Sequence, residues 1–318
     1  MKGDNKRRII AITGTILLLF FLIFYIIKHS SDFTQLASAG IHHFPTIILA
    51  SFLFFILISL NGYLLNILLS VFGLKLPLRE WYGLAVTNNF YNLITPFKGG
   101  MAALALYLKD KYGLGYMHYI AVQGAIQFFT LFTAALTILI CIPFMKDIPG
   151  KAKGPVFLLF FLGIIFQVII LIYSPRFRMR EGKWFQRFIN LNNGWTAIKG
   201  NKKLVAALLI VNFIQRFLKG VFLVLVYKCV GIPLDFVSAL FISSVGMFSL
   251  IITLLPGNLG IDDAVNIFSA RLAGIFLNGA IAATLLGRLI NFVVSLTLGP
   301  IFSYTLFIQK KSSTTDSH

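Results

Sequence analysis

The sequence is poor in charged residues, and above all in acidic ones. Of its 318 residues only 12% are charged and 10 are Asp or Glu, whereas 58% are hydrophobic and the mean hydropathy is +0.87. Soluble domains carry about 25% charged residues, so this composition cannot coat a water-facing surface. Together with long apolar runs, this scarcity excludes a soluble protein and predicts a polytopic membrane protein.

Cysteine and the common catalytic motifs are equally scarce. Two cysteines, Cys141 and Cys229, offer neither a disulfide framework nor metal-ligand spacing, so we expect both to pack among helices. The motifs H-E-x-x-H, G-x-S-x-G and G-x-x-x-x-G-K-[ST] are all missing from the sequence. We therefore expect no catalytic residues, no metal, no cofactor and no ATP-driven pumping, and a protein that is not an enzyme.

What the chain has in excess is positive charge, with a formal net charge of +18. In a membrane protein this excess indicates cytoplasmic loops that face anionic lipid, and no nucleic-acid motif accompanies it, so we expect no nucleic-acid partner. The loops and termini predicted to lie on one side carry 18 Lys and Arg residues, and those on the other side carry 5. This bias predicts cytoplasmic N- and C-termini. The absence of any N-x-[ST] site is compatible with a bacterial plasma membrane.

The hydrophobic pattern predicts an all-α bundle of membrane-spanning helices in a single membrane domain, residues 1–312, followed by a polar tail, 313–318. Each predicted span is close to or above the roughly 20 residues needed to cross a bilayer. The spans are 9–27, 45–70, 117–142, 155–174, 204–228 and 281–307. The basic segment 175–203 is predicted to be an amphipathic element at the cytoplasmic lipid surface.

Two apolar stretches, 81–108 and 236–278, are broken by proline and glycine and are predicted to be re-entrant hairpins of two short helices. The predicted tip residues are Pro96, Gly99 and Gly100 in the first hairpin, and Pro256, Gly257 and Gly260 in the second. Gly and Pro positions recur at offsets of 156 to 160 residues between the two halves. We interpret 45–142 and 204–307 as inverted repeats, an arrangement typical of transport sites near the bilayer midplane.

Ionisable residues inside the apolar stretches are candidates for function, because their burial in a membrane is costly. We expect a polar cavity lined by Lys98, Arg216, Lys219 and Arg288, with Asp262 or Asp263 as the counter-charge. Four bases against two acids fit an anionic headgroup such as a phosphate, which arginine can bind through two parallel hydrogen bonds. Two alternatives stay open at this point: Lys219 extends to the lipid surface, and Arg216 and Arg288 form structural ion pairs. Arg271 is expected at the interface.

The two tips also resemble a known family. Residues 255–264, Leu-Pro-Gly-Asn-Leu-Gly-Ile-Asp-Asp-Ala, are similar to the pattern L-P-G-G-L-G-V-x-E-A of the lysylphosphatidylglycerol synthase transmembrane, or flippase-like, family. Asp263 stands where that family has Glu, and Arg288 where it usually has Arg. The first tip, residues 92–100, is more weakly similar to L-x-P-x-R-x-G-E-x-x-R, with Lys98 in place of an Arg.

This sequence departs from the family in its first half. Met101 and Leu104 replace a Glu and an Arg, and residues 123–127 lack the charges of the family's E-R-x-x-D. The resemblance implies translocation of an anionic phospholipid or a polyprenyl-phosphate-type lipid, with membrane lipids as partners. It also leaves open a non-transporting accessory role beside an enzyme of lipid or cell-envelope glycan biosynthesis. Since the chain ends at His318 without a synthase domain, we do not expect it to make an aminoacylated lipid.

Overall fold

The computed structural model describes residues 43–95, 98–146, 148–173, 183–251 and 256–308, and within these ranges all regular structure is helical. Among the described residues, five helices are long and apolar enough to cross a membrane. They are α3 (Phe44–Leu69), α6 (Tyr116–Cys141), α7 (Gly150–Ile172), α9 (Lys202–Cys229) and α12 (Leu277–Ser303). They correspond to five of the six predicted spans; the sixth, 9–27, lies outside the described residues.

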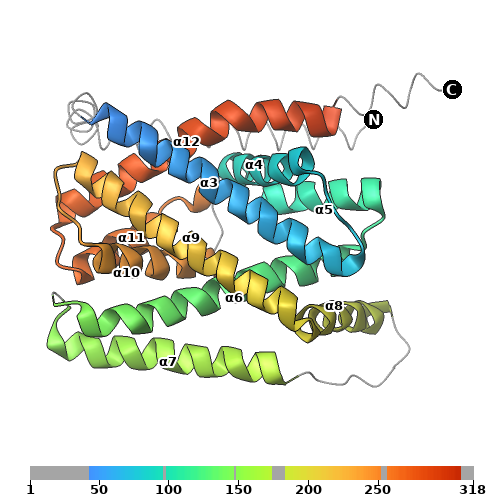
Figure 1. Cartoon of the computed structure of the whole chain (residues 1–318), viewed down its shortest axis with the longest axis horizontal. Coiled ribbons are helices and arrows are strands. Elements are labelled where there is room, and N and C mark those ends of the chain that lie inside the picture. The colour runs from blue at the N-terminus through green and yellow to red at the C-terminus, as the bar shows by residue number, and fades with distance from the viewer. Residues whose placement is uncertain (1–42, 96–97, 147, 174–182, 252–255, 309–318) are drawn as a thin grey trace, which may run out of the picture.

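Each of the two broken stretches contains a pair of short helices. The first pair is α4 (Leu78–Ile94) with α5 (Gly99–Tyr112), and the second is α10 (Phe236–Gly246) with α11 (Ile261–Leu272). Within each pair the two helices pack against each other. In Figure 1 the first pair lies toward one end of the long helices, at the right, and the second lies toward the opposite end.

Residues 183–200, in the predicted surface segment, form α8 (Lys183–Gly200), which packs against α6. The indole of Trp195 meets the ring of Phe128 edge-on at 5.0 Å between centroids. α7 and α8 therefore both pack against α6.

The halves 45–142 and 204–307 make matching contacts. α3 packs on α4 just as α9 packs on α10, and α3 and α9 also pack against each other. Across the halves, α12 packs on α4 and α6 packs on α10. Each pair of short helices is therefore covered by the last long helix of the other half.

Two separate hydrophobic cores lie at the opposite ends of this bundle. One is built around Leu64, Leu104 and Phe129, near the first pair of short helices. The other is built around Phe222 and Phe241, near the second pair, and it contains Cys141 and Cys229, both buried as free thiols. The central turns of α3, α6 and α9 lie between these cores and carry polar side chains.

Candidate functional site

A cavity of about 350 Å³ occupies the space between the two cores. Its lining includes three cationic side chains, those of Lys98, Arg216 and Lys219, and one acidic side chain, that of Asp262. The remaining polar lining is uncharged and comes from Asn61, Asn89, Asn92, Gln127, Thr130, Gln215, Asn258 and Asn291. A volume of this size falls within the range of small-molecule sites.

Arg216 is the most deeply buried cation of the cavity. Its side chain belongs to α9, and only 5% of the residue is exposed. Both Nε and Nη1 are buried without a hydrogen-bond partner among the described residues. The structure therefore does not contain the ion pair with Asp262 or Asp263 that the sequence left open for Arg216. Its unpaired N–H groups remain available to an anionic ligand.

The neighbours of Arg216 on α9 are hydrogen-bonded across the bundle. Gln215 donates to Asn61 Oδ1 of α3 at 3.1 Å, and Thr130 of α6 donates to Asn212 Oδ1 at 3.0 Å. These bonds fix α9 against α3 and α6, so the position of Arg216 is set by its helix. Sequence reasoning did not single out Asn61, Gln215 or Thr130, although a polar residue within an apolar run is the signal that would have identified them.

Lys98 joins the two broken stretches. It begins α5 with a left-handed backbone conformation, φ +55°, and its Nζ donates to the carbonyl oxygen of Leu250 at 3.1 Å. Leu250 precedes the second tip, so a side chain at the start of α5 contacts the backbone of the second broken stretch. Lys98 is partly buried and lines the cavity.

Lys219 lies at the boundary between this cavity and a smaller one of about 130 Å³, since it lines both. Its ammonium is 4.4 Å from the ring centroid of Phe222 and 5.8 Å from that of Phe54. Such cation–π contacts stabilise an ammonium that is removed from water. Lys219 thus packs on aromatic rings inside the bundle instead of extending to the lipid surface.

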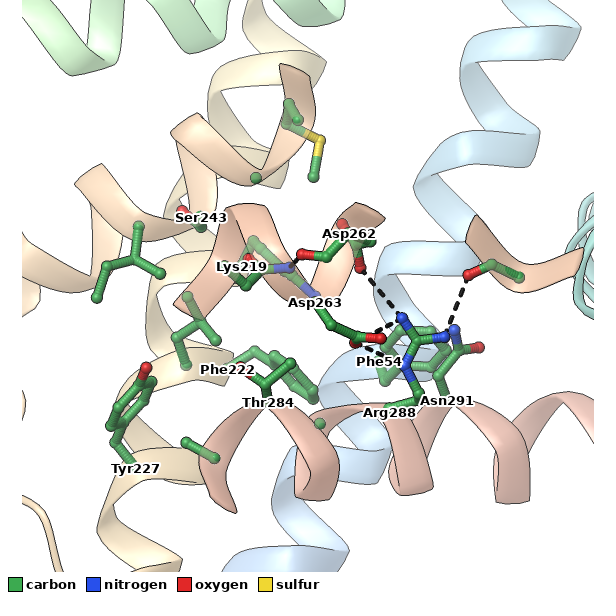
Figure 2. A pocket seen from close by; sticks show the side chains of 18 residues that line it. Phe54, Lys219, Phe222, Tyr227, Ser243, Asp262, Asp263, Thr284, Arg288 and Asn291 are labelled. Atoms are coloured by element: carbon green, nitrogen blue, oxygen red, sulfur yellow. Dashed lines mark hydrogen bonds and ion pairs between the residues drawn. The ribbon is translucent and has the colours of Figure 1, made fainter. Parts of the chain in front are cut away.

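Arg288 forms the ion pair that the sequence left open. Its Nε and Nη2 both donate to Asp263 Oδ1, at 2.9 and 2.6 Å, and its Nη1 donates to the carbonyl oxygen of Gly257 at 3.2 Å (Figure 2). Asp263 Oδ2 accepts from the backbone N–H of Gly260 at 3.0 Å. Both carboxylate oxygens of Asp263, at the start of α11, therefore accept hydrogen bonds, and the ion pair connects α12 to the second tip.

Asp262 has a different environment from its neighbour. Its Oδ1 accepts from Ser249 Oγ at 2.8 Å, and its Oδ2 is 3.9 Å from Arg288 Nη2. The Asp262 side chain is 38% exposed and lines both cavities, as Lys219 does. Figure 2 shows both side chains in the smaller cavity. Asp262 thus lines both cavities, whereas Asp263 lines only the smaller one and is held in the ion pair with Arg288.

The predicted tip residues have clear roles where the structure describes them. Gly100 donates its N–H to Asn92 Oδ1 at 3.0 Å, and Gly99 precedes it in the first turn of α5. Gly257 and Gly260 adopt φ values of +59° and +82°, which only glycine reaches without strain. Pro256 begins a single 3₁₀ turn, Pro256–Asn258, and Pro96 lies outside the described residues.

Two further polar side chains, those of Gln123 and Arg271, lie outside the cavity. Gln123 of α6 donates to the Tyr119 hydroxyl at 2.9 Å and does not line the cavity, whereas Gln127, one turn later, does. Arg271 is exposed and donates to the carbonyl oxygen of Ile275 at 3.1 Å. Within the described ranges, no group of three His, Cys, Asp or Glu side chains is arranged to hold a metal ion.

Comparison with known proteins agrees with this architecture. Residues 8–299 match the family described as the lysylphosphatidylglycerol synthase TM region. The chain is also 25% identical over 166 residues to the UPF0104 membrane protein MJ1078 of Methanocaldococcus jannaschii, an alignment that covers 51% of this chain and 69% of that protein. Since the family match extends over most of its length, the chain is a multi-pass membrane protein that belongs to the lysylphosphatidylglycerol synthase TM region family.

Proposed function

We propose that the protein is a lipid translocase and not an enzyme, and that it moves an anionic phospholipid or a polyprenyl-phosphate-type lipid. The phosphate-bearing headgroup crosses through the cavity around Arg216, while the lipid tails stay in the bilayer. The observation that carries this proposal is the buried guanidinium of Arg216, which has two N–H-bearing nitrogens without a partner among the described residues.

An unpaired buried cation is costly, by several kcal/mol for the ion alone. A phosphate oxygen that reaches Arg216 would recover much of this cost, because the guanidinium fork matches phosphate geometry. The wider charge balance favours the same ligand. Lys98, Arg216 and Lys219 line the cavity with Asp262 as its one acidic side chain among the described residues, which leaves an excess of positive charge.

The proposal takes the two pairs of short helices as re-entrant hairpins of an inverted repeat. Backbone conformations at equivalent positions support this. Lys98 and Asn258, the two non-glycine residues with positive φ within the described ranges, are 160 residues apart, and each stands two residues after the proline of its tip. Gly73 and Gly231, 158 residues apart, follow α3 and α9 with φ values of +76° and +75°.

A second correspondence concerns close packing. A Cβ added at Gly62 of α3 would lie 2.7 Å from the carbonyl oxygen of Trp81 in α4. A Cβ added at Gly220 of α9 would lie 2.9 Å from Leu240 in α10. Each glycine thus lets a long helix approach the first helix of its own hairpin. Inverted repeats with broken helices are typical of transporters whose substrate site lies between the halves.

The two hairpins lie at opposite ends of the bundle, and the basic residues at one end decide the proposed orientation in the membrane. The end of the bundle that holds the first hairpin also holds α8 (Figure 1). The first hairpin carries Arg79 in α4 and Lys109 and Lys111 in α5, and Lys75 lies in the loop before it. Following the positive-inside rule, we assign this end to the cytoplasm of a bacterial plasma membrane, with both termini on the same side.

The test is lipid scrambling by purified protein in phosphatidylcholine vesicles that contain a trace of fluorescent phosphatidylglycerol. Dithionite, added outside, bleaches the outer leaflet alone unless the protein brings inner-leaflet lipid to the surface. We expect wild-type vesicles to bleach beyond the outer leaflet, and R216Q to slow this step at least about tenfold, since a charge-assisted hydrogen bond contributes about 1.5–3 kcal/mol.

R271Q is the matched control, because it removes the same charge from an exposed arginine outside the cavity and should scramble at the wild-type rate. Wild-type scrambling by R216Q would contradict the proposal. The accessory role beside a lipid- or glycan-synthesising enzyme would then be the better interpretation. In that case, neutralising Lys199, Lys202 and Lys203 should disturb function more than any change in the cavity.

A further inference from the structure

The uncharged polar side chains that line the cavity limit which hydrogen-bonding groups a ligand must offer, in addition to the negative charge that the cations require. Carboxamide side chains reach it from five helices: Asn61 of α3, Asn92 of α4, Gln127 of α6, Gln215 of α9 and Asn291 of α12. A carboxamide both donates and accepts hydrogen bonds. Some of these amides bond within the bundle, as Gln215 does to Asn61, so the amide atoms that have no partner are the ones left for a ligand.

The polar atoms left without partners have the same mixed character. Gln127 Nε2 and the Arg216 nitrogens are buried donors without partners among the described residues. Asn258 Oδ1 is a buried acceptor in the same situation, in a residue that is 7% exposed, while its Nδ2 donates to the carbonyl oxygen of Ser249 at 3.1 Å. A ligand that satisfies all of these atoms must offer acceptor oxygens and also hydrogen-bond donors.

A hydroxyl group is the hydrogen-bond donor that suits this cationic cavity best. An ammonium would also donate, but Lys98, Arg216 and Lys219 line the same cavity and would repel it. A neutral hydroxyl carries no such penalty, and it can donate to an acceptor such as Asn258 Oδ1 while it accepts from an amide such as Gln127 Nε2. Several hydroxyls on one headgroup fit a wall built from several carboxamides.

We infer that the cavity selects a phosphodiester lipid with a polyhydroxylated headgroup, such as a sugar or an inositol, over a phosphodiester lipid without hydroxyls. This inference rests on the proposed function, because it concerns the same cavity and names the class of headgroup. The phosphate contacts Arg216, and the hydroxyl groups contact Gln127 and Asn258.

The test compares ligands that differ in hydroxyl groups but carry the same charge. One pair is dioctanoyl phosphatidylinositol and dioctanoyl phosphatidylmethanol, and the other is farnesyl phosphoglucose and farnesyl methyl phosphate. Dissociation constants are measured by titration calorimetry with the purified protein in detergent. We expect the hydroxylated member of at least one pair to bind at least about tenfold more tightly, the effect of one or two net hydrogen bonds. The pair that shows the preference identifies the source as a glycerophospholipid or a polyprenyl lipid.

Two variants locate the preference. Q127M keeps the length of the side chain without the amide, and N258G keeps the left-handed backbone without the side chain. Each should reduce the preference several-fold, whereas Q123M, on the same helix but outside the cavity, should keep it. Each variant is compared with wild type only if it elutes as a single folded species with cooperative thermal unfolding.

The outcomes separate this inference from the proposed function. Equal binding within both pairs by wild type, with binding lost in R216Q, would overturn the polyhydroxylated headgroup and leave the anionic cavity in place. A preference that survives both Q127M and N258G would also overturn it, because the hydroxyls would then be recognised elsewhere. If wild type binds none of the four ligands, the proposed function itself fails.

Discussion

Arg288 donates two hydrogen bonds to a single oxygen of Asp263, while the other oxygen of that carboxylate accepts the backbone N–H of Gly260. The two side chains are 9% and 8% exposed, so the pair is shielded from water. It ties the last long helix to the first turn of α11 and to the tip before it. The same arginine also holds the carbonyl oxygen of Gly257.

This relationship predicts a large loss of stability when either partner is removed. D263N and R288Q should each destabilise the protein by about 3–5 kcal/mol, because the remaining charge stays buried without its partner. The measurement is the free energy of unfolding in detergent for both single variants and for the double variant. The double variant should lose less than the sum of the single losses, and strictly additive losses would contradict a direct interaction.

Removing the charge of Asp262 should strengthen the binding of an anionic ligand, whereas R216Q should weaken it. As the acid that faces the cavity, it opposes an anion there, so D262N should bind dioctanoyl phosphatidylmethanol about threefold or more tightly than wild type. D110N, at an exposed position, makes the same change in net charge and should have no effect. Equal affinities for D262N and wild type would show that Asp262 does not act on a bound anion.

The contact between α4 and α5 at Glu80 predicts a pH dependence of stability. Glu80, in the first turn of α4, accepts hydrogen bonds from Tyr107 and Lys111 at 2.6 and 2.7 Å and from Tyr112 at 2.8 Å. Burial acts to raise the pKa of Glu80, but these bonds and the ammonium charge outweigh it and lower the pKa below the ordinary value of 4.5. A carboxylate with a lowered pKa stabilises the fold above its unfolded pKa.

This stabilisation should therefore disappear as the pH falls below about 4.5 toward the lower folded pKa. Melting temperatures of wild type and E80Q measured from pH 7 to pH 3 test the prediction. Wild type should be the more stable protein at pH 7, and the difference should shrink as the solution becomes acidic. A difference that stays constant over this range would mean that the charge of Glu80 is not what ties α4 to α5.

Helix packing predicts that Gly62 cannot be replaced by alanine without cost. The added Cβ would lie 2.7 Å from the Trp81 carbonyl oxygen, a backbone atom that cannot rotate away. G62A should destabilise the protein by about 1–3 kcal/mol. G124A, in α6, meets no atom within 4 Å and should be neutral or stabilising, because alanine favours a helix over glycine. Thermal unfolding of both variants checks this, and an unaffected G62A would contradict the close approach of α3 and α4.

The sequence predicts the spans well, because a membrane imposes length and apolarity on every helix that crosses it. It also indicates that Arg216, Lys219 and Arg288 face the interior of the bundle, because a charged side chain exposed to lipid within a span costs free energy. It could not decide between Asp262 and Asp263 as the partner of Arg288. That choice depends on Gly260, whose N–H orients the Asp263 carboxylate at the start of α11.

Contacts between segments that are distant in the sequence cannot be predicted from the hydrophobic periodicity. Lys111 is one of several basic residues in a predicted loop, and nothing local indicates that it contacts Glu80, 31 residues earlier in the chain. The left-handed conformation of Lys98 is likewise not encoded by its residue type, because such a backbone is rare for lysine. It is the tight turn into α5 that requires it.

The exposure of α7 has a consequence for which substitutions this sequence can accept. None of its residues, from Gly150 to Ile172, is buried, even though it is the most apolar of the long helices. Its side chains are therefore constrained by the thickness and chemistry of the bilayer and much less by the shape of neighbouring atoms. Most of its apolar positions should accept any other apolar residue, and a library randomised over α7 should retain far more folded members than one randomised over α9.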